Sequence, residues 1–154
     1  MSLKGNSNAE RIWNFLISKG LNPFGVAGLM GNLDRESGLS PINLQNNYEK
    51  LLGFTDDTYT TSVDNGDYQN FVYDKAGYGI AQWTYWSRKQ NLQKYAQKKG
   101  TSIGDLEMQL EFLMQELSSG YKSVLNVLWN WILFRKFSSQ EEVENVAAQL
   151  LEFA

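Results

Sequence analysis

Two short segments of this chain carry the residue types that could do chemistry. The first is an apolar run with spaced glycines over residues 25–33, which ends in Asp34-Arg35-Glu36-Ser37-Gly38. The second is Gly77-Tyr78-Gly79-Ile80-Ala81-Gln82-Trp83. A carboxylate at the end of a buried helix, facing a Gly-x-Gly-x-x-Gln turn, can place a general acid over a sugar chain. Because the chain has no histidine and no cysteine, Ser-His-Asp sites, Cys-His sites and ordinary zinc sites are excluded.

Glu36 is the candidate for this general acid. We expect it at the C-terminal end of its helix, where the helix dipole presents partial negative charge. Leu33, Leu39 and the aromatic residues near Trp83 would add desolvation. Both effects favour the protonated carboxyl group, which suits a proton donor near neutral pH. The alternative is an exposed glutamate paired with Arg35.

The second segment has features of a ligand-binding loop. Gly77 and Gly79 allow the backbone to approach a ligand closely, and Gln82 offers a donor and an acceptor to an acetamido or hydroxyl group. The alternative is a plain turn before a helix that begins near Thr84. A Gly-x-Gly pattern alone is weak evidence, but Glu36 lies about forty residues upstream, and the pairing of the two segments is more specific.

Two helices are predicted to position Glu36. The first begins at a capping box over residues 7–10 and ends at Gly20. The second has Asn22 as its N-cap and Pro23 in its first turn. Three glycines recur in it at every third position: Gly25, Gly28 and Gly31. Since each costs up to about 1 kcal/mol of helix propensity, we expect this helix to press closely against a neighbour.

The middle of the chain, residues 37–76, is polar and has little helical periodicity. We predict a small β hairpin there, with strands at 60–63 and 68–72 around a turn at 64–67. A polar segment of this length inside a compact domain is usually functional.

Helices are predicted again after Trp83. One covers 86–99 and ends at Gly100, and the next is capped by Ser102-x-x-Asp105 and carries an apolar face. Two more are predicted over 121–134 and from about Ser139. The fold class is therefore α+β, mainly helical, with a small β hairpin region.

The composition limits the classes of partner. The 154 residues, 42% hydrophobic and 20% charged, are typical of one globular domain. A net charge of −3 argues against nucleic acid or an anionic membrane surface as partners, and no apolar run is long enough to insert into a membrane. We interpret residues 1–6 as an expression leader and 7–154 as a monomeric catalytic domain cut from a longer protein.

The two segments resemble the lysozyme-like superfamily, which includes goose-type lysozymes and soluble lytic transglycosylases. The resemblance is closer to the phage-tail lysozyme family, through residues 27–38, 78–84 and 104–113, and spans roughly residues 8 to 128. It implies a lysozyme-like fold with a substrate cleft. It also implies an enzyme that hydrolyses peptidoglycan outside the cell, associated with the cell wall or a phage tail.

The resemblance also implies roles for individual residues. Glu36 would be the catalytic acid, and Gln82 would line the sugar groove together with Ser37 and Gly79. Aromatic side chains could line the sugar subsites: Tyr48, Tyr73, Tyr78, Trp83 and Trp86.

The second carboxylate is open at this stage. Asp74 aligns best with an aspartate of goose-type enzymes, and Asp64 and Asp67 in the predicted hairpin are its rivals. Thr84 departs from the pattern, because goose-type enzymes carry another aspartate there, and the way in which water is activated is therefore open as well.

The predicted activity is cleavage of the β-1,4 bond between N-acetylmuramic acid and N-acetylglucosamine, with glycan strands of peptidoglycan as the partner and without metal or cofactor. One alternative is a lytic transglycosylase, which needs only the glutamate and forms a 1,6-anhydro product. Another is a non-catalytic module that binds glycan without cleaving it.

Overall fold

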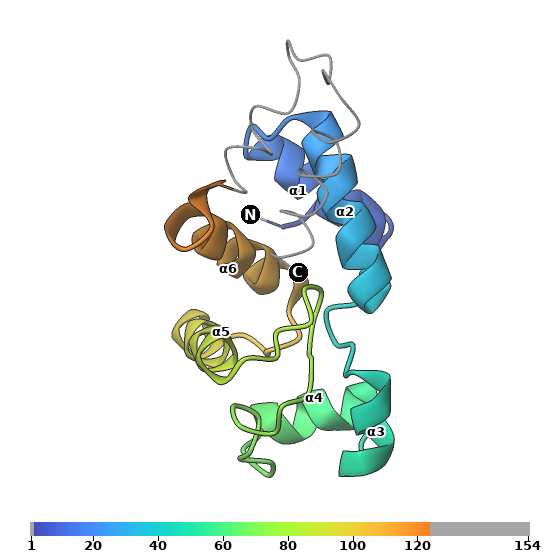
Figure 1. Cartoon of the computed structure of the whole chain (residues 1–154), viewed down its shortest axis with the longest axis vertical. Helices are drawn as coiled ribbons and strands as arrows, with labels where there is room; N and C mark the ends of the chain where they lie inside the picture. The colour runs from blue at the N-terminus through green and yellow to red at the C-terminus, as the bar shows by residue number, and fades with distance from the viewer. Residues whose placement is uncertain (1, 124–154) are drawn as a thin grey trace. The chain divides into compact units, whose positions relative to one another are not determined.

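The computed structural model describes residues 2–123 (Figure 1). The helices in this part are α1 (Asn8–Ser18), α2 (Pro23–Ser37), α3 (Asn46–Leu52), α4 (Asp56–Asp64), α5 (Trp86–Lys99) and α6 (Leu106–Ser119). The chain divides into two compact units. The second unit is Glu36–Phe112, and the first holds the described residues before it and after it, 2–35 and 113–123. The helix predicted at 121–134, beyond its first three residues, and the one from Ser139 lie outside the described residues.

The first unit confirms the predicted caps of α1 and α2. The Ser7 hydroxyl accepts a hydrogen bond from the Glu10 backbone N–H at 3.2 Å, and the Glu10 carboxylate accepts from the Asn6 N–H at 2.8 Å. At the start of α2, the Asn22 side-chain oxygen accepts from the Phe24 N–H at 2.9 Å. Helix starts leave several N–H groups without intrahelical partners, so these side chains determine where both helices begin.

The buried face of α2 carries aliphatic residues, and Gly25 is buried as well, whereas Gly31 is exposed. Val26, Leu29 and Leu33 are fully buried, which is the spacing of one helical face. A Cβ added to Gly31 would meet nothing within 4 Å. The prediction that this helix presses against a neighbour through its glycines is therefore wrong at Gly31, which faces open space.

In the second unit, the predicted β hairpin is wrong. Residues 60–64, assigned to its first strand and turn, belong to α4, and no strand forms anywhere in residues 2–123. The helix is started by Thr55, whose hydroxyl accepts from the Thr58 N–H while the Thr58 hydroxyl accepts from the Thr55 N–H. This reciprocal cap and the burial of one helical face outweigh the strand preference of the Thr and Val residues.

Backbone pairing in the second unit is limited to isolated bridges. Tyr78 pairs with Leu44 and with Trp83 in antiparallel fashion. The mainly helical character predicted from the sequence is thus confirmed for the described residues, whereas the β part shrinks to these two bridges around the Gly77–Trp83 segment.

The two helices predicted after this segment are present, although Asp105 caps the second and Ser102, which was predicted to share that cap, bonds to the Gly104 N–H instead. Helix α5 ends at Gly100, which has a left-handed φ of 68°. The Asp105 carboxylate accepts from the Met108 N–H at 2.8 Å and caps α6. The buried residues of α5 are Lys89, Leu92 and Ala96, so a lysine occupies a core position. Among residues 2–123, no helix has both the length and the apolar character that a membrane span requires.

Candidate active site

Glu36 lies in the last turn of α2, where the sequence places it. Its side chain is exposed, so the burial expected from neighbouring apolar residues is absent: Leu33 is in the core and Leu39 is only half-buried. Within residues 2–123, the Glu36 carboxylate makes no hydrogen bond or ion pair, including with Arg35. The carboxyl group is therefore accessible to a ligand and not committed to a structural contact.

Ser37 joins the two predicted segments inside the second unit. Its hydroxyl donates a buried hydrogen bond of 2.8 Å to the carbonyl oxygen of Ile80, 43 residues later. Ile80 is the central residue of the Gly77–Trp83 segment. The residue next to Glu36 is therefore attached directly to the loop that was predicted to lie near it.

The Gly77–Trp83 loop closes on itself through Tyr78 and Trp83. The Tyr78 N–H donates to the Trp83 carbonyl at 3.1 Å, and the Trp83 N–H donates to the Tyr78 carbonyl at 2.9 Å. Gly79 turns with a φ of +80°, and a Cβ there would come within 2.9 Å of the Gln109 side chain and 3.0 Å of the Trp83 ring. The glycine at this position is thus required by packing within the protein.

Gln82 holds the loop against the segment that follows α2. Its side-chain amide nitrogen donates to the Asn43 carbonyl at 3.0 Å, to the Asn43 side-chain oxygen at 3.0 Å and to the Gly79 carbonyl at 3.1 Å. Its side-chain oxygen would lie 2.7 Å from a Cβ on Gly77, so Gly77 leaves room for this amide. Gln82 is half-buried, and its donors are already used inside the protein.

Two of the predicted sugar-contact aromatics, Tyr78 and Trp83, are fully buried. The Tyr78 hydroxyl is 2.6 Å from the Thr60 hydroxyl, and the Trp83 ring packs edge-on against Phe112 at 5.6 Å. Their rings belong to the core of the second unit and present no face to a ligand. By contrast, Tyr73 is 62% exposed and is available on the surface.

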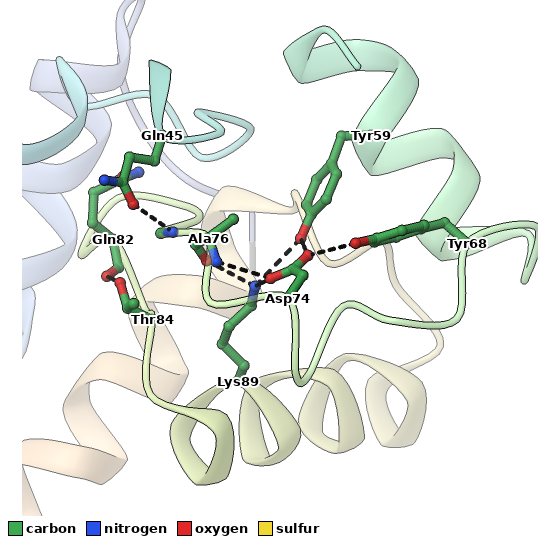
Figure 2. Close-up of polar contacts among 9 residues, drawn as sticks. Gln45, Tyr59, Tyr68, Asp74, Ala76, Gln82, Thr84 and Lys89 are labelled. Atoms are coloured by element: carbon green, nitrogen blue, oxygen red, sulfur yellow. Dashed lines mark hydrogen bonds and ion pairs between the residues drawn. The ribbon is translucent and has the colours of Figure 1, made fainter. Parts of the chain in front are cut away.

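Asp74 is at the centre of a buried polar network (Figure 2). One carboxylate oxygen is 2.6 Å from the Lys89 ammonium nitrogen and accepts from the Ala76 N–H at 2.9 Å. The other accepts from the Tyr59 hydroxyl at 2.6 Å and from the Tyr68 hydroxyl at 3.0 Å. A carboxylate that orients a nucleophilic water needs a free oxygen lone pair facing the substrate. The geometry therefore favours a structural role for Asp74 over the catalytic role predicted from the sequence.

Burial governs the electrostatics of this network. It lowers the pKa of Lys89 from its ordinary value, while the adjacent Asp74 carboxylate acts in the opposite direction. Burial raises the pKa of Tyr59, and the hydrogen bond to Asp74 raises it further. Burial also raises the pKa of Tyr68 to about 12, with Asp74 again adding to the shift. The tyrosines are therefore neutral hydrogen-bond donors to Asp74 at neutral pH.

The rival carboxylates, Asp64 and Asp67, do not lie on a strand, because the hairpin that would carry them is absent. Asp64 accepts hydrogen bonds from the Ser102 hydroxyl and, at 2.9 Å, from the Ile103 N–H. It thereby ties the end of α4 to the loop before α6, beside a surface depression of about 290 Å³. Asp67 is exposed in the turn after α4. Neither is shown to face Glu36, and their catalytic roles stay predictions.

Strained backbone marks the same segments. Among residues 2–123, the residues other than glycine with positive φ are Leu39 at 60°, Lys75 at 63° and Gln82 at 48°. Left-handed backbone costs a residue with a side chain about 1–3 kcal/mol and persists only where surrounding contacts impose it. Leu39 follows Glu36 closely, and Lys75 follows Asp74. This clustering is typical of functional loops.

Sequence reasoning missed two residues that hold these loops, Lys89 and Gln109. Gln109 is fully buried; its side-chain oxygen accepts from the Ile80 N–H at 3.0 Å, and its nitrogen donates to the carbonyls of Pro41 and Ile103, each at 2.7 Å. Both residues are polar side chains at apolar-face positions of helices that the sequence predicts. A polar residue at such a position departs from the helical pattern, and this departure was the sequence signal that could have identified both residues.

Among residues 2–123, no group of three or more acidic side chains is placed to hold a metal ion.

Comparison with known proteins identifies the family. No curated protein and no solved structure matches the chain. A family model for phage tail lysozyme matches residues 7–150, which include Glu36, the Gly77–Trp83 loop and Gln109. The chain therefore belongs to the phage tail lysozyme family.

Proposed function

We propose that this protein is a muramidase, which cleaves the β-1,4 bond between N-acetylmuramic acid and N-acetylglucosamine in peptidoglycan. Its family indicates a peptidoglycan-degrading enzyme associated with phage tails. The observation that carries the finer proposal is the exposed Glu36 carboxyl group, next to a serine that is hydrogen-bonded to Ile80 of the Gly77–Trp83 loop.

Glu36 is the general acid in this proposal. Its carboxyl group donates a proton to the glycosidic oxygen as the bond to the anomeric carbon breaks, and the sugar passes through a state with oxocarbenium character. Water then adds to the anomeric carbon, and the proton that it releases restores the protonated Glu36. No histidine is present in the chain to share this work. The glycan lies in a groove beside Glu36, and the loop containing Gly79 and Gln82 forms one wall through its shape and its remaining acceptors.

A second candidate function, a lytic transglycosylase, is favoured by the contacts of Asp74. Both of its oxygens are occupied by Lys89, Ala76 and two tyrosines, so it does not provide a base for water. A transglycosylase needs no second carboxylate, because the 6-hydroxyl of the muramic acid residue attacks its own anomeric carbon. Its proton passes to the Glu36 carboxylate, which has just given up its own, and an anhydro end is formed.

Digestion of purified peptidoglycan separates these functions. The fragments are analysed by mass spectrometry before and after borohydride reduction, and Glu36→Gln serves as the inactive control. A muramidase leaves reducing muramic acid ends, which gain hydrogen on reduction. A transglycosylase leaves anhydro ends, which are one water lighter and resist reduction. Saturable binding to peptidoglycan without release of any fragment would refute both catalytic functions and leave a glycan-binding module.

A further inference from the structure

We propose that Tyr73, Tyr85 and Trp86 together form a binding surface for one pyranose ring of a glycan strand. We call these three residues the aromatic surface. The choice of a glycan as the occupant rests on the proposed function, whereas the existence of the surface rests on the geometry alone.

The three rings are exposed and in contact with one another. The side chains are 62%, 63% and 45% exposed for Tyr73, Tyr85 and Trp86. The Tyr73 and Trp86 rings are stacked, with centroids 6.1 Å apart and planes 23° apart. The Tyr85 ring lies 6.0 Å from that of Trp86 at an angle of 41°. Contiguous exposed apolar side chains of this kind mark binding sites more often than isolated ones do.

The exposure of these rings is unusual within the second unit. Four other aromatic residues of this unit pack into its core with no more than 1% exposure: Tyr59, Phe71, Tyr78 and Trp83. The rest are buried or half-buried: Tyr48, Phe54, Tyr68, Tyr95 and Phe112. The unit therefore has a core that accommodates large rings, and the aromatic surface lies outside it. Burying ring surface is favourable by about 25 cal/mol per Å², so a ligand that covers these rings gains free energy that folding has left unused.

The buried ion pair fixes the two chain segments that carry the rings. Tyr73 directly precedes Asp74, and Trp86 lies three residues before Lys89, whose ammonium group is 2.6 Å from Asp74. The Lys89 N–H also donates to the Tyr85 carbonyl at 3.0 Å, at the start of α5. The rings are thus held on a rigid base before any ligand arrives, which lowers the entropic cost of binding.

The chemistry of the surface matches a sugar ring. A β-1,4-linked hexosamine has equatorial substituents, so its axial C–H groups form an apolar face that can lie on the negative face of an aromatic ring. Two phenol hydroxyls and one indole N–H at the edges of the rings can bond to the surrounding hydroxyl and acetamido groups. The three side chains carry no formal charge at neutral pH, and a neutral N-acetylated sugar needs no charged partner.

The test measures binding without turnover, in the full chain carrying Glu36→Gln. The probes are soluble oligomers of β-1,4-linked N-acetylglucosamine, followed by titration calorimetry, and insoluble peptidoglycan, followed by co-sedimentation. We expect Tyr73→Ala, Tyr85→Ala and Trp86→Ala each to weaken binding about tenfold, which equals about 1.4 kcal/mol. Tyr73→Phe and Trp86→Phe, which keep a ring, should restore most of the affinity.

Two control variants test whether the effect belongs to this surface. Leu51→Ala removes an apolar side chain of the same unit that is 73% exposed, and Phe24→Ala removes a ring of α2 that is 65% exposed. Neither should change the affinity. Thermal unfolding of every variant checks the fold. If an alanine variant unfolds, Tyr73→Phe still tests the proposal, because a loss of affinity in Tyr73→Phe would contradict the stacking role.

The proposal is overturned if all three alanine variants bind as tightly as their parent, or if Leu51→Ala weakens binding as much as they do. Its failure is distinguishable from failure of the proposed function. Fragment release by the unmodified chain, with unchanged binding in the alanine variants, would refute the aromatic surface and leave the muramidase intact. If glycan binding depends on the rings but the unmodified chain releases no fragment, the result would support the aromatic surface and refute the muramidase.

Discussion

The ammonium nitrogen of Lys89 lies 2.6 Å from a carboxylate oxygen of Asp74, and both side chains are completely buried. The same nitrogen donates to the Ala76 carbonyl at 2.8 Å and lies 4.3 Å from the centre of the Phe71 ring. The pair therefore attaches the start of the Gly77–Trp83 loop to α5. Desolvating two charges is costly, and such a pair is tolerated when further hydrogen bonds complete its coordination, as they do here.

Replacing Lys89 by Met should destabilise the fold strongly. The substitution leaves the Asp74 carboxylate buried without its counter-ion, and breaking one side of a buried pair costs about 3–5 kcal/mol. Urea unfolding measures the change. The matched control is Lys99→Met, which breaks a partly exposed pair with Glu111 at 2.5 Å and should lose much less, because solvent screens that pair. Equal losses in the two variants would contradict a structural role for the buried pair.

Replacing Glu36 by Gln should lower the rate of peptidoglycan cleavage by about 10²–10⁴-fold, because the amide cannot donate the proton. Unfolding should be unchanged, since Glu36 is exposed. Turbidity loss of cell-wall suspensions measures the rate. Asp34→Asn, an exposed carboxylate two residues earlier in the same helix, is the control and should stay active. Near-normal clearing by Glu36→Gln would remove Glu36 from the mechanism.

Alkaline pH should unfold the protein as its tyrosines ionise. Burial raises the pKa of Tyr59, Tyr68 and Tyr78, whereas unfolded tyrosines ionise near pH 10. Above that pH the unfolded state loses protons that the folded state keeps, so this stability is present below pH 10 and is lost as the pH rises toward about 12 for Tyr68. The lowered pKa of Lys89 acts with the opposite sign, but that contribution is complete once the pH passes 10.5, the value for an unburied lysine. The tyrosine contribution continues to fall above that pH.

Urea unfolding at several pH values between about 8 and 11, together with tyrosinate absorbance, measures this dependence. We expect part of the tyrosine absorbance change to appear only when the protein unfolds. Tyr59→Phe is the informative variant, because it removes one of the ionising hydroxyls and should flatten the decline. A free energy of unfolding that stayed constant through pH 11 would show that these hydroxyls are not buried donors.

Replacing Gly79 by Ala should cost more than replacing Gly66 by Ala. Both glycines have left-handed backbone, with φ of +80° and +83°, but only Gly79 has neighbours within 4 Å of an added Cβ. The conformational cost of about 1–3 kcal/mol is common to both. Overpacking against Gln109 and Trp83 should add about 1–3 kcal/mol at Gly79 alone. The difference between the two unfolding free energies isolates this packing cost, and identical values would mean that the loop yields freely.

Local signals in the sequence correctly predicted several helices. Asn22 and Pro23 predicted the start of α2, and Glu36 was correctly placed at the end of that helix. Gly100 predicted the end of α5. Caps, prolines and left-handed glycines act within one turn of the chain, so their effects can be read from neighbouring residues. The order of Glu36-Ser37 and Gly-x-Gly-x-x-Gln was also enough to indicate the phage tail lysozyme family, which the match over residues 7–150 confirms.

Tertiary structure alone decided which side chains are buried and which are free. Tyr78 and Trp83 pack in the core while Tyr73 and Trp86 lie on the surface, although all four are aromatic residues near the same loop. The sequence predicts a catalytic role for Asp74, and its contact with Lys89, fifteen residues away, favours a structural one. Burial and ion pairing depend on contacts between residues distant in sequence, and a pattern of residue types does not specify those contacts. The chemistry available to a carboxylate depends on what surrounds it, and only the folded chain shows that Glu36 is exposed whereas Asp74 is buried and paired with Lys89.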